Sequence, residues 1–172
     1  MKQLIGFCIG LILTGTLQAQ GTTEDVAPYK KDPTIPAFNI QLVDSSWYTK
    51  EQLPKQYAHT IIIYFSPECG HCQHEAKEIV QHMDSLKNTF FLFVAYKPLE
   101  DVKGFAAYYG LDKLANVRIG RDPKYFIPAF YRVKYTPFLA VYNQKGLLEK
   151  IYDTENTPLP ETSELIAFVN RN

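Results

Sequence analysis

The chain has no excess of charge of either sign. Its 172 residues include 18 Lys and Arg and 18 Asp and Glu, which gives a formal net charge of +0. Proteins that bind nucleic acid through its phosphates ordinarily present a basic surface, so the charge balance gives no support to a nucleic-acid partner. The hydrophobic content is 46% and the charged content 21%, which is typical of a globular protein rather than a disordered one.

Long hydrophobic runs are also scarce, and the longest one lies at the N-terminus. The residues from Leu4 to Leu17 are almost wholly apolar and follow the positively charged start Met1-Lys2. Ala19 offers a small residue at a cleavage point, so residues 1–19 are predicted to be a signal peptide. The run is short for a membrane span, and an uncleaved N-terminal anchor is the alternative. We therefore expect an exported, periplasmic protein that contacts the membrane only if the leader is retained.

Cysteine is scarce as well, with three in the chain. Cys8 lies inside the predicted leader, and the bulky Phe7 before it argues against a lipoprotein signal. Cys69 and Cys72 are then the one possible intramolecular pair, in a compartment where disulfides persist. A bridge between them closes a very small loop and constrains the unfolded chain little. The spacing therefore favours redox chemistry, and an inert structural bridge is the alternative.

The two cysteines lie between a strand pattern and a helix pattern. Cys69-Gly70-His71-Cys72 follows the apolar run Thr60–Phe65. A helix N-terminus carries unpaired N–H groups and a positive dipole end, which lower the pKa of a thiol placed there. At about 100° per residue, Cys72 falls on the apolar stripe of the helix, while Cys69 stays at the exposed tip of the turn. The stripe consists of Ala76, Ile79, Val80, Met83 and Leu86. An exposed attacking thiol with a shielded partner suits disulfide exchange.

The rest of the chain alternates between strand and helix patterns. A flexible lead-in is predicted over 20–35, a loop or short helix over 46–55, and one domain over 36–172. Strands are expected at 38–42, 61–65, 90–96, 117–119, 138–142 and 147–152, and helices after the dithiol, from 100 to 109, after Asp122-Pro123 and after Pro160-Glu161. This order predicts an α/β sandwich with a mixed sheet and the dithiol at the carboxyl end of a central strand.

These features together resemble the thioredoxin-like family, and within it the exported TlpA/ResA-like group. The resemblance covers residues 36–172. It is carried by the Cys69–Cys72 motif after an apolar strand, by Glu75 just past the second cysteine, and by Thr136-Pro137 immediately before a strand. A strand–helix insertion over 99–133 adds to it. The implied fold is a thioredoxin-like sandwich, in which a central mixed β-sheet is flanked by helices.

The resemblance implies a thiol–disulfide oxidoreductase that uses no cofactor beyond its own Cys69–Cys72 dithiol. Cys69 would attack a partner disulfide as the thiolate, and Cys72 would then release the product. Pro137 would be a cis proline opposite the dithiol, and Thr136 would offer its main chain to a bound peptide. The expected partners are exported protein thiols and disulfides together with an upstream electron donor. We expect a monomer that acts more as a reductant than as an oxidant.

Two further residues are candidates for tuning this chemistry. His71 lies between the thiols, where a cation would stabilise the Cys69 thiolate and make the protein more oxidising; the alternative is a solvated turn residue. Glu75 lies at the edge of the buried stripe and could accept the proton of Cys72 if burial raises its pKa. The alternative is an ordinary solvated carboxylate. The strand before the motif, Ile61–Ile63, carries no acid, so Glu75 is the better candidate for a proton relay.

Other functions of a dithiol give alternative hypotheses. A disulfide isomerase or oxidant would use the same residues. A copper-handling protein would use the thiolates as soft ligands for Cu(I), but helical spacing points His74 to solvent and places His82 nearly three turns away, so no metal site is expected. A thiol peroxidase is suggested by Ser66-Pro67-Glu68-Cys69, which echoes part of the peroxiredoxin motif. Ile62 stands where that motif has proline.

Overall fold

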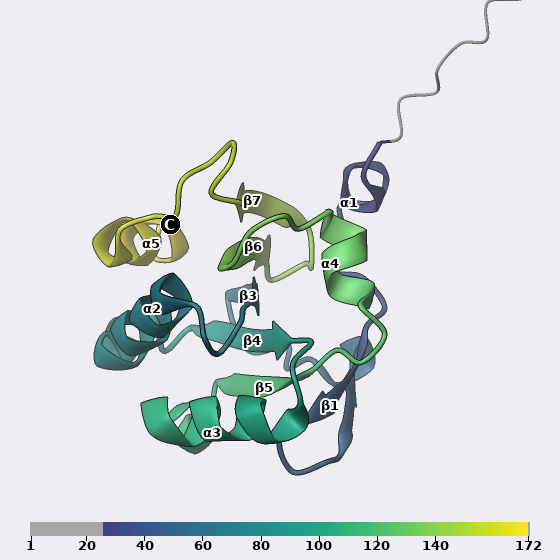
Figure 1. The fold of residues 1–172 in the computed structure, drawn as a ribbon. Helices are drawn as coiled ribbons and strands as arrows, with labels where there is room; N and C mark the ends of the chain where they lie inside the picture. The colour runs from purple at the N-terminus through teal and green to yellow at the C-terminus, as the bar shows by residue number, and fades with distance from the viewer. Residues whose placement is uncertain (1–25, 172) are drawn as a thin grey trace, which may run out of the picture.

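The computed structural model describes residues 26–171. The predicted leader over 1–19 and Cys8 lie outside the described residues. Within them, one seven-stranded mixed sheet runs in the order β2-β1-β5-β4-β3-β6-β7, and helices cover both of its faces (Figure 1). The predicted α/β sandwich with a mixed sheet is therefore confirmed.

The strands and helices have short connections. The strands are β1 (Asn39–Leu42), β2 (Trp47–Thr49), β3 (His59–Tyr64), β4 (Thr89–Ala95), β5 (Val117–Arg121), β6 (Phe138–Asn143) and β7 (Leu148–Tyr152). The α-helices are α1 (Pro28–Lys31), α2 (Gly70–Gln81), α3 (Leu99–Tyr109), α4 (Phe126–Tyr131) and α5 (Thr162–Val169), and 3₁₀ turns occupy Lys50–Gln52, Met83–Leu86 and Leu111–Lys113. Strands β3, β4 and β5 are parallel, and the remaining pairs are antiparallel.

Strand β3 lies between β4 and β6 at the centre of the sheet, and it is buried on both faces because helices pack against each face. Ile61 and Ile63 belong to the core under α2, α3 and α5, whereas Ile62 and Tyr64 belong to the core under α4. Figure 1 shows the two helical layers on opposite sides of the strands. Burial on both faces explains why the sequence has a continuous apolar run here rather than an alternating one.

The first described residues differ from the predicted flexible lead-in. Helix α1 occupies Pro28–Lys31, and Ile35 is buried with its N–H donating to the carbonyl of Gly146 at 3.1 Å. Thr34 also forms a β-bridge with Leu147. Residues 26–35 thus pack against the hairpin between β6 and β7, and the domain extends to the N-terminal side of the predicted boundary at residue 36.

Two predicted elements differ in detail. The segment 46–55 contains strand β2, which pairs with β1, as well as the expected short helical turn. The helix expected directly after Asp122-Pro123 begins only at Phe126. The carboxylate of Asp122 instead accepts the N–H groups of Lys124 and Ile127, at 3.2 and 2.7 Å. It closes the turn that leads into α4 and accepts an N–H of the first turn of that helix from a few residues upstream.

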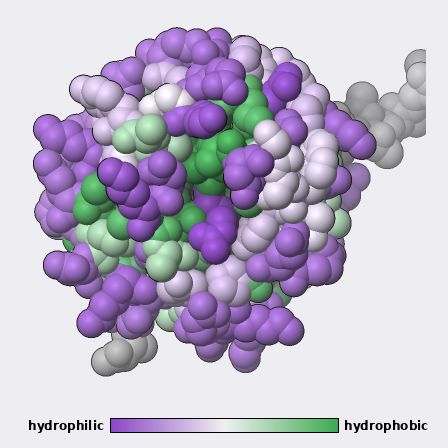
Figure 2. Space-filling model, turned by 90° about the horizontal axis from the view of Figure 1, so that it is seen from below, coloured by the Kyte–Doolittle hydropathy of each residue, from purple (hydrophilic) through white to green (hydrophobic). Residues whose placement is uncertain are grey.

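The surface is mixed in character. Figure 2 shows the molecule from below relative to Figure 1, with hydrophobic residues in a broken band between hydrophilic side chains. On α3, the side chain of Tyr108 is 82% exposed. None of the helices in the described part of the chain has the length and apolar character needed to cross a membrane.

Candidate redox site

The site is built on the turn that leads from β3 into α2. Phe65 continues the β3–β4 ladder by donating its N–H to the carbonyl of Val94 at 2.9 Å. The chain then turns, and the Cys69 N–H donates to the carbonyl of Ser66 at 3.1 Å. The side-chain amide of Gln73 donates to the carbonyl of Pro67 at 2.9 Å. These bonds fix the turn from both sides and place Cys69 at the N-cap of α2.

Cys69 is the more accessible of the two free thiols in the described part of the chain. Its Sγ lies 3.4 Å from the N–H of Cys72, which donates to it, and 3.4 Å from the carbonyl of Thr136, to which the thiol donates. Burial raises the pKa of the Cys69 thiol, but its hydrogen bonds with the Cys72 side chain and N–H, with Thr136 and with the His71 backbone outweigh burial. The net pKa lies below its usual value. Cys69 is thus the thiol that ionises first.

Cys72 has the opposite character. Its side chain is 2% exposed and belongs to the core under α2. Burial, followed by the hydrogen bond with Cys69, raises the pKa of the Cys72 thiol to about 12. The expected arrangement, with Cys72 inward and Cys69 at the tip of the turn, is therefore present. A buried thiol with so high a pKa is inert until a base takes its proton.

Glu75 lies one helical turn beyond Cys72, on the same side of α2. It is 8% exposed. Burial raises the pKa of Glu75 to about 7, and the nearby Glu78 carboxylate adds to the increase. Of the two alternatives considered for Glu75, the buried carboxyl with a raised pKa describes this environment. Its role as a proton acceptor stays a prediction.

Thr136 and Pro137 face the dithiol, and the peptide bond between them is cis. They lie far from Cys69 in the sequence, but β6 pairs antiparallel with β3 and sets Phe138 opposite Tyr64. The start of β6 therefore lies beside the end of β3, where the dithiol begins. Sheet pairing brings the two predicted halves of the site together.

A groove opens beside the dithiol. It has a volume of about 400 Å³, and its lining consists of His71, Tyr135, Thr136, Pro137, Thr154, Pro158 and Leu159. His71 is exposed at its edge. The lining is largely apolar and contains no acidic residue. The groove can accept an extended peptide segment beside Cys69, with His71 at one side.

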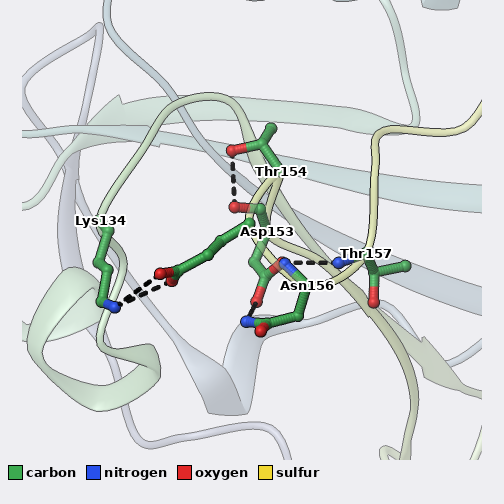
Figure 3. Close-up of polar contacts among 6 residues, drawn as sticks. Lys134, Asp153, Thr154, Asn156 and Thr157 are labelled. Carbon is green, nitrogen blue, oxygen red and sulfur yellow. Dashed lines mark hydrogen bonds and ion pairs between the residues drawn. The ribbon is translucent and has the colours of Figure 1, made fainter.

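The far wall of this groove is the loop between β7 and α5, which the sequence reasoning missed. Figure 3 shows how Asp153 organises it. Its Oδ1 accepts the N–H groups of Asn156 and Thr157 at 2.7 and 3.0 Å, and its Oδ2 accepts from the Asn156 side chain at 2.7 Å. Lys134, which lies on the other wall shortly before Thr136-Pro137, pairs with Glu155 at 2.9 Å. The two walls are thus joined by an ion pair.

We expect Asp153→Ala to loosen this wall without changing the chemistry at the thiols. Losing the acceptor of three hydrogen bonds in an exposed turn should destabilise the protein by on the order of 1 kcal/mol. It should also raise the KM for peptide disulfides several-fold, and leave the rate with the small 2-hydroxyethyl disulfide unchanged. The measurement is steady-state kinetics with both substrates.

Asp44→Ala is the matched control. The Asp44 carboxylate accepts from the N–H and hydroxyl of Ser46 at 2.9 and 2.6 Å in a similar turn. That turn joins β1 to β2, at the opposite end of the sheet from the dithiol. If Asp44→Ala raises the KM as much as Asp153→Ala does, the loop is not a substrate wall.

The rim on the other side of Cys69 carries a paired charge that the sequence pattern does not reveal. Glu68 accepts from the Ser66 hydroxyl at 2.6 Å and pairs with Lys97 at 3.0 Å. The hydrogen bond from Ser66, together with that from Lys97, lowers the pKa of Glu68 to about 2. Lys97 comes from the loop that follows β4. Because β4 pairs in parallel with β3, this loop lies at the same edge of the sheet as the turn that carries the dithiol.

The three histidines other than His71 do not lie beside the thiols. His74 is exposed, and the His82 ring contacts the carbonyl of Glu78 at 3.0 Å, at the far end of α2. His59 begins β3 and pairs with Glu149 at 3.2 Å, at the end of the strand remote from the dithiol. Among the described residues, no group of three His, Cys, Asp or Glu could hold a metal ion.

The comparisons with known proteins agree with this architecture. No protein-family model matches the chain, and no curated protein is similar to it in sequence. A secreted disulfide oxidoreductase of Mycobacterium tuberculosis, described as homologous to DsbE of E. coli, superposes with a TM-score of 0.64 and 19% identity, over 77% of this chain and 94% of that one.

Two other solved structures show the same likeness. DsbF of M. tuberculosis matches with a TM-score of 0.62 and 20% identity, over 79% of this chain and 97% of that one. A thioredoxin-like protein from Aeropyrum pernix matches with a TM-score of 0.61 and 10% identity, over 77% and 88%. At these identities the likeness shows the fold, and the predicted thioredoxin-like fold is confirmed.

Proposed function

We propose that this protein is an exported thiol–disulfide oxidoreductase that exchanges electrons with partner proteins through Cys69 and Cys72. The observation that carries the proposal is the inequality of the two thiols. Cys69 has a lowered pKa and partial exposure, whereas Cys72 is buried with a pKa of about 12. An inert structural bridge has no need of such a difference. The thioredoxin-like fold and its secreted structural neighbour support the same function.

The reaction proceeds in two exchange steps. The Cys69 thiolate attacks one sulfur of a partner disulfide, forms a mixed disulfide and expels the other sulfur as a thiolate, which takes up a proton. Cys72 then loses its proton to Glu75, and its sulfur attacks Cys69 and releases the second partner sulfur. The partner gains two electrons and two protons, and the protein ends as the Cys69–Cys72 disulfide. An upstream donor of the same chemistry restores the dithiol.

The surroundings of Cys69 favour a reductant. A strongly oxidising dithiol requires a strongly stabilised thiolate. Among the described residues, only neutral groups donate hydrogen bonds to the Cys69 sulfur, and burial, the largest influence on its pKa, opposes ionisation. His71 is the group that would shift the balance toward an isomerase or oxidant, because it borders the same groove.

The reduction potential tests the proposal. We expect the protein to equilibrate with glutathione buffers at about −230 mV or below, the range of thioredoxin and the lower end of glutaredoxins. His71→Gln should move the potential to a more negative value, because a potential cation next to Cys69 is removed while the backbone N–H that interacts with the Cys69 sulfur is kept. The measurement is the reduced fraction, quantified by alkylation and gel shift across the buffer series.

The measured reduction potentials distinguish the alternative functions. A potential of about −180 to −120 mV would identify an isomerase or oxidant instead. A dithiol that does not exchange with glutathione at any ratio would refute the oxidoreductase function. An unchanged potential in His71→Gln would make the His71 side chain that of a solvated turn residue.

A further inference from the structure

A second groove adjoins the dithiol and has no part in the exchange reaction. It lies between α2 and α3 and consists of two neighbouring cavities of about 630 and 370 Å³. Both cavities are lined by Gln73, Tyr108 and Tyr109. The groove begins at Pro67 and Gly70, on either side of Cys69, and continues along α2 to Gln81. We call it the α2–α3 groove.

Aromatic side chains from α3 form one side of the α2–α3 groove. The ring centroids of Phe105 and Tyr109 are 4.7 Å apart, and those of Tyr108 and Tyr109 are 4.9 Å apart. Tyr108 is 82% exposed, so it is held at the surface by a packed neighbour rather than buried for stability. Exposed tyrosines on a rigid base are frequent anchors of protein interfaces, because they bury large area with little loss of rotamer entropy.

The opposite side of the α2–α3 groove is basic. His74 and Lys77 line it from α2, and no Asp or Glu lines either cavity. Among residues 26–171, no carboxylate pairs with Lys77. The N-terminal end of α2 at Gly70 adds a positive dipole end at the entrance of the groove. A ligand that complements this lining is negatively charged and carries an apolar or aromatic side chain.

A glycine within α3 supports a role for the open space. Gly104 lines the smaller cavity, and a Cβ added to it would meet nothing within 4 Å. Glycine in a helix interior costs about 1 kcal/mol relative to alanine. Packing within the chain does not explain this cost, whereas an incoming chain that approaches the α3 backbone would.

We propose that the α2–α3 groove docks an acidic segment of the partner protein beside the partner's reactive cysteine. The proposal deepens the oxidoreductase function and rests on it. Lys77 lies about 10 Å along the helix axis from Gly70, at about 1.5 Å per residue. An extended peptide covers that distance in about three residues. The acidic residues therefore lie about three to six positions from the cysteine of the partner.

The test uses synthetic peptides in which a single cysteine is disulfide-bonded to 2-mercaptoethanol. One pair of peptides carries Glu at positions three to six from the cysteine, on either side, with a leucine between. A second pair replaces each Glu by Gln. We expect the reduced protein to reduce the acidic peptides on the order of tenfold faster at low salt, and the preference to shrink at high salt. The measurement is single-turnover release of 2-mercaptoethanol and peptide thiol.

Variants locate the docking site. Lys77→Gln should abolish most of the acidic preference, and Tyr108→Ala should slow the acidic peptides several-fold. Lys103→Gln is the matched control, because Lys103 is exposed on α3 and lines neither cavity. All three variants should reduce 2-hydroxyethyl disulfide, which is too small to reach the groove, at the parent rate.

The results with 2-hydroxyethyl disulfide and with the peptides test the oxidoreductase function and the docking proposal separately. No reaction with 2-hydroxyethyl disulfide would mean that the oxidoreductase function itself fails. Normal reaction with it but equal rates for Glu and Gln peptides, or equal losses in Lys77→Gln and Lys103→Gln, would overturn the docking proposal alone. A change in the sedimentation-equilibrium mass of Tyr108→Ala would overturn it too, because the groove would then hold a second copy of the chain.

Discussion

Cys72→Ser is expected to accumulate a covalent disulfide with its partner, whereas Cys69→Ser forms none. Cys69 has the lowered pKa and the exposure that an attacking thiol needs. Cys72 is 2% exposed and has a pKa of about 12, so at pH 7 only about one molecule in 10⁵ carries it as a thiolate. Without Cys72 the mixed disulfide has no internal thiol to resolve it. Without Cys69 no attack occurs.

The measurement is turnover of a peptide disulfide together with non-reducing gels or mass spectrometry of the product. Both variants should lose at least about 10³-fold in turnover, but only Cys72→Ser should carry the bound peptide. The variants are made in a Cys8→Ser background so that the thiol of the predicted leader does not contribute. An adduct on Cys69→Ser, or turnover that survives in it, would reverse the assigned order of the two cysteines.

Alkylation of the reduced protein extends this result to the unmodified dithiol. Iodoacetamide at pH 7 should label Cys69 and leave Cys72 unlabelled until the protein is unfolded. Labelling of both at similar rates would mean that the two thiols are not held in unequal environments.

Glu75→Gln is expected to remove the pH dependence of the second exchange step. The pKa of Glu75 is about 7 because the carboxyl is buried and the charge of Glu78 adds to the increase. In the parent protein, the rate of peptide release from the Cys69 mixed disulfide should therefore rise as the pH increases through about 7 and Glu75 ionises. The variant lacks the proton acceptor, so its rate above pH 7 should be on the order of 10²-fold lower. The measurement is single-turnover release from pH 5 to pH 9.

The same substitution should change stability in a defined pH window. Burial disfavours the ionised form of Glu75, so its folded-state pKa of about 7 lies above the reference value of 4.5. Between these pH values the unfolded chain releases the proton and the folded chain keeps it. Stability therefore falls as pH rises, by up to about 3 kcal/mol at about 1.4 kcal/mol per pH unit. Glu75→Gln should match the parent near pH 4 and exceed it at pH 8.

Glu78→Gln provides the control for both Glu75 readouts. It removes the neighbouring carboxylate that raises the pKa of Glu75, and so should move the kinetic pKa and the stability transition to lower pH without abolishing either. A Glu75→Gln variant with the parent pH profile for peptide release would make Glu75 a buried structural carboxyl. A parallel shift of stability at all pH values would mean that its ionisation is not involved.

The local pattern of the chain determined the redox turn and most of the secondary structure. The apolar run of β3 is long because both of its faces are buried, and the helical stripe that contains Cys72 and Ala76 places Cys72 inward. Both signals arise from neighbours in sequence, which is why the unequal thiols could be predicted. The helical pattern placed Glu75 only at the edge of the stripe and left its burial open, and the packing of the fold decided it. The cis proline followed from the resemblance, not from the local pattern.

The tertiary structure decided what lies across from that turn. Cys69 meets Thr136 only because β6 pairs with β3, and Glu155 meets Lys134 only because β7 returns beside β6. The α2–α3 groove exists because the two helices cover the same face of the sheet. Such contacts depend on strand order and register, which periodicity does not encode. The sequence therefore determined the reacting groups, and the fold determined what they can reach.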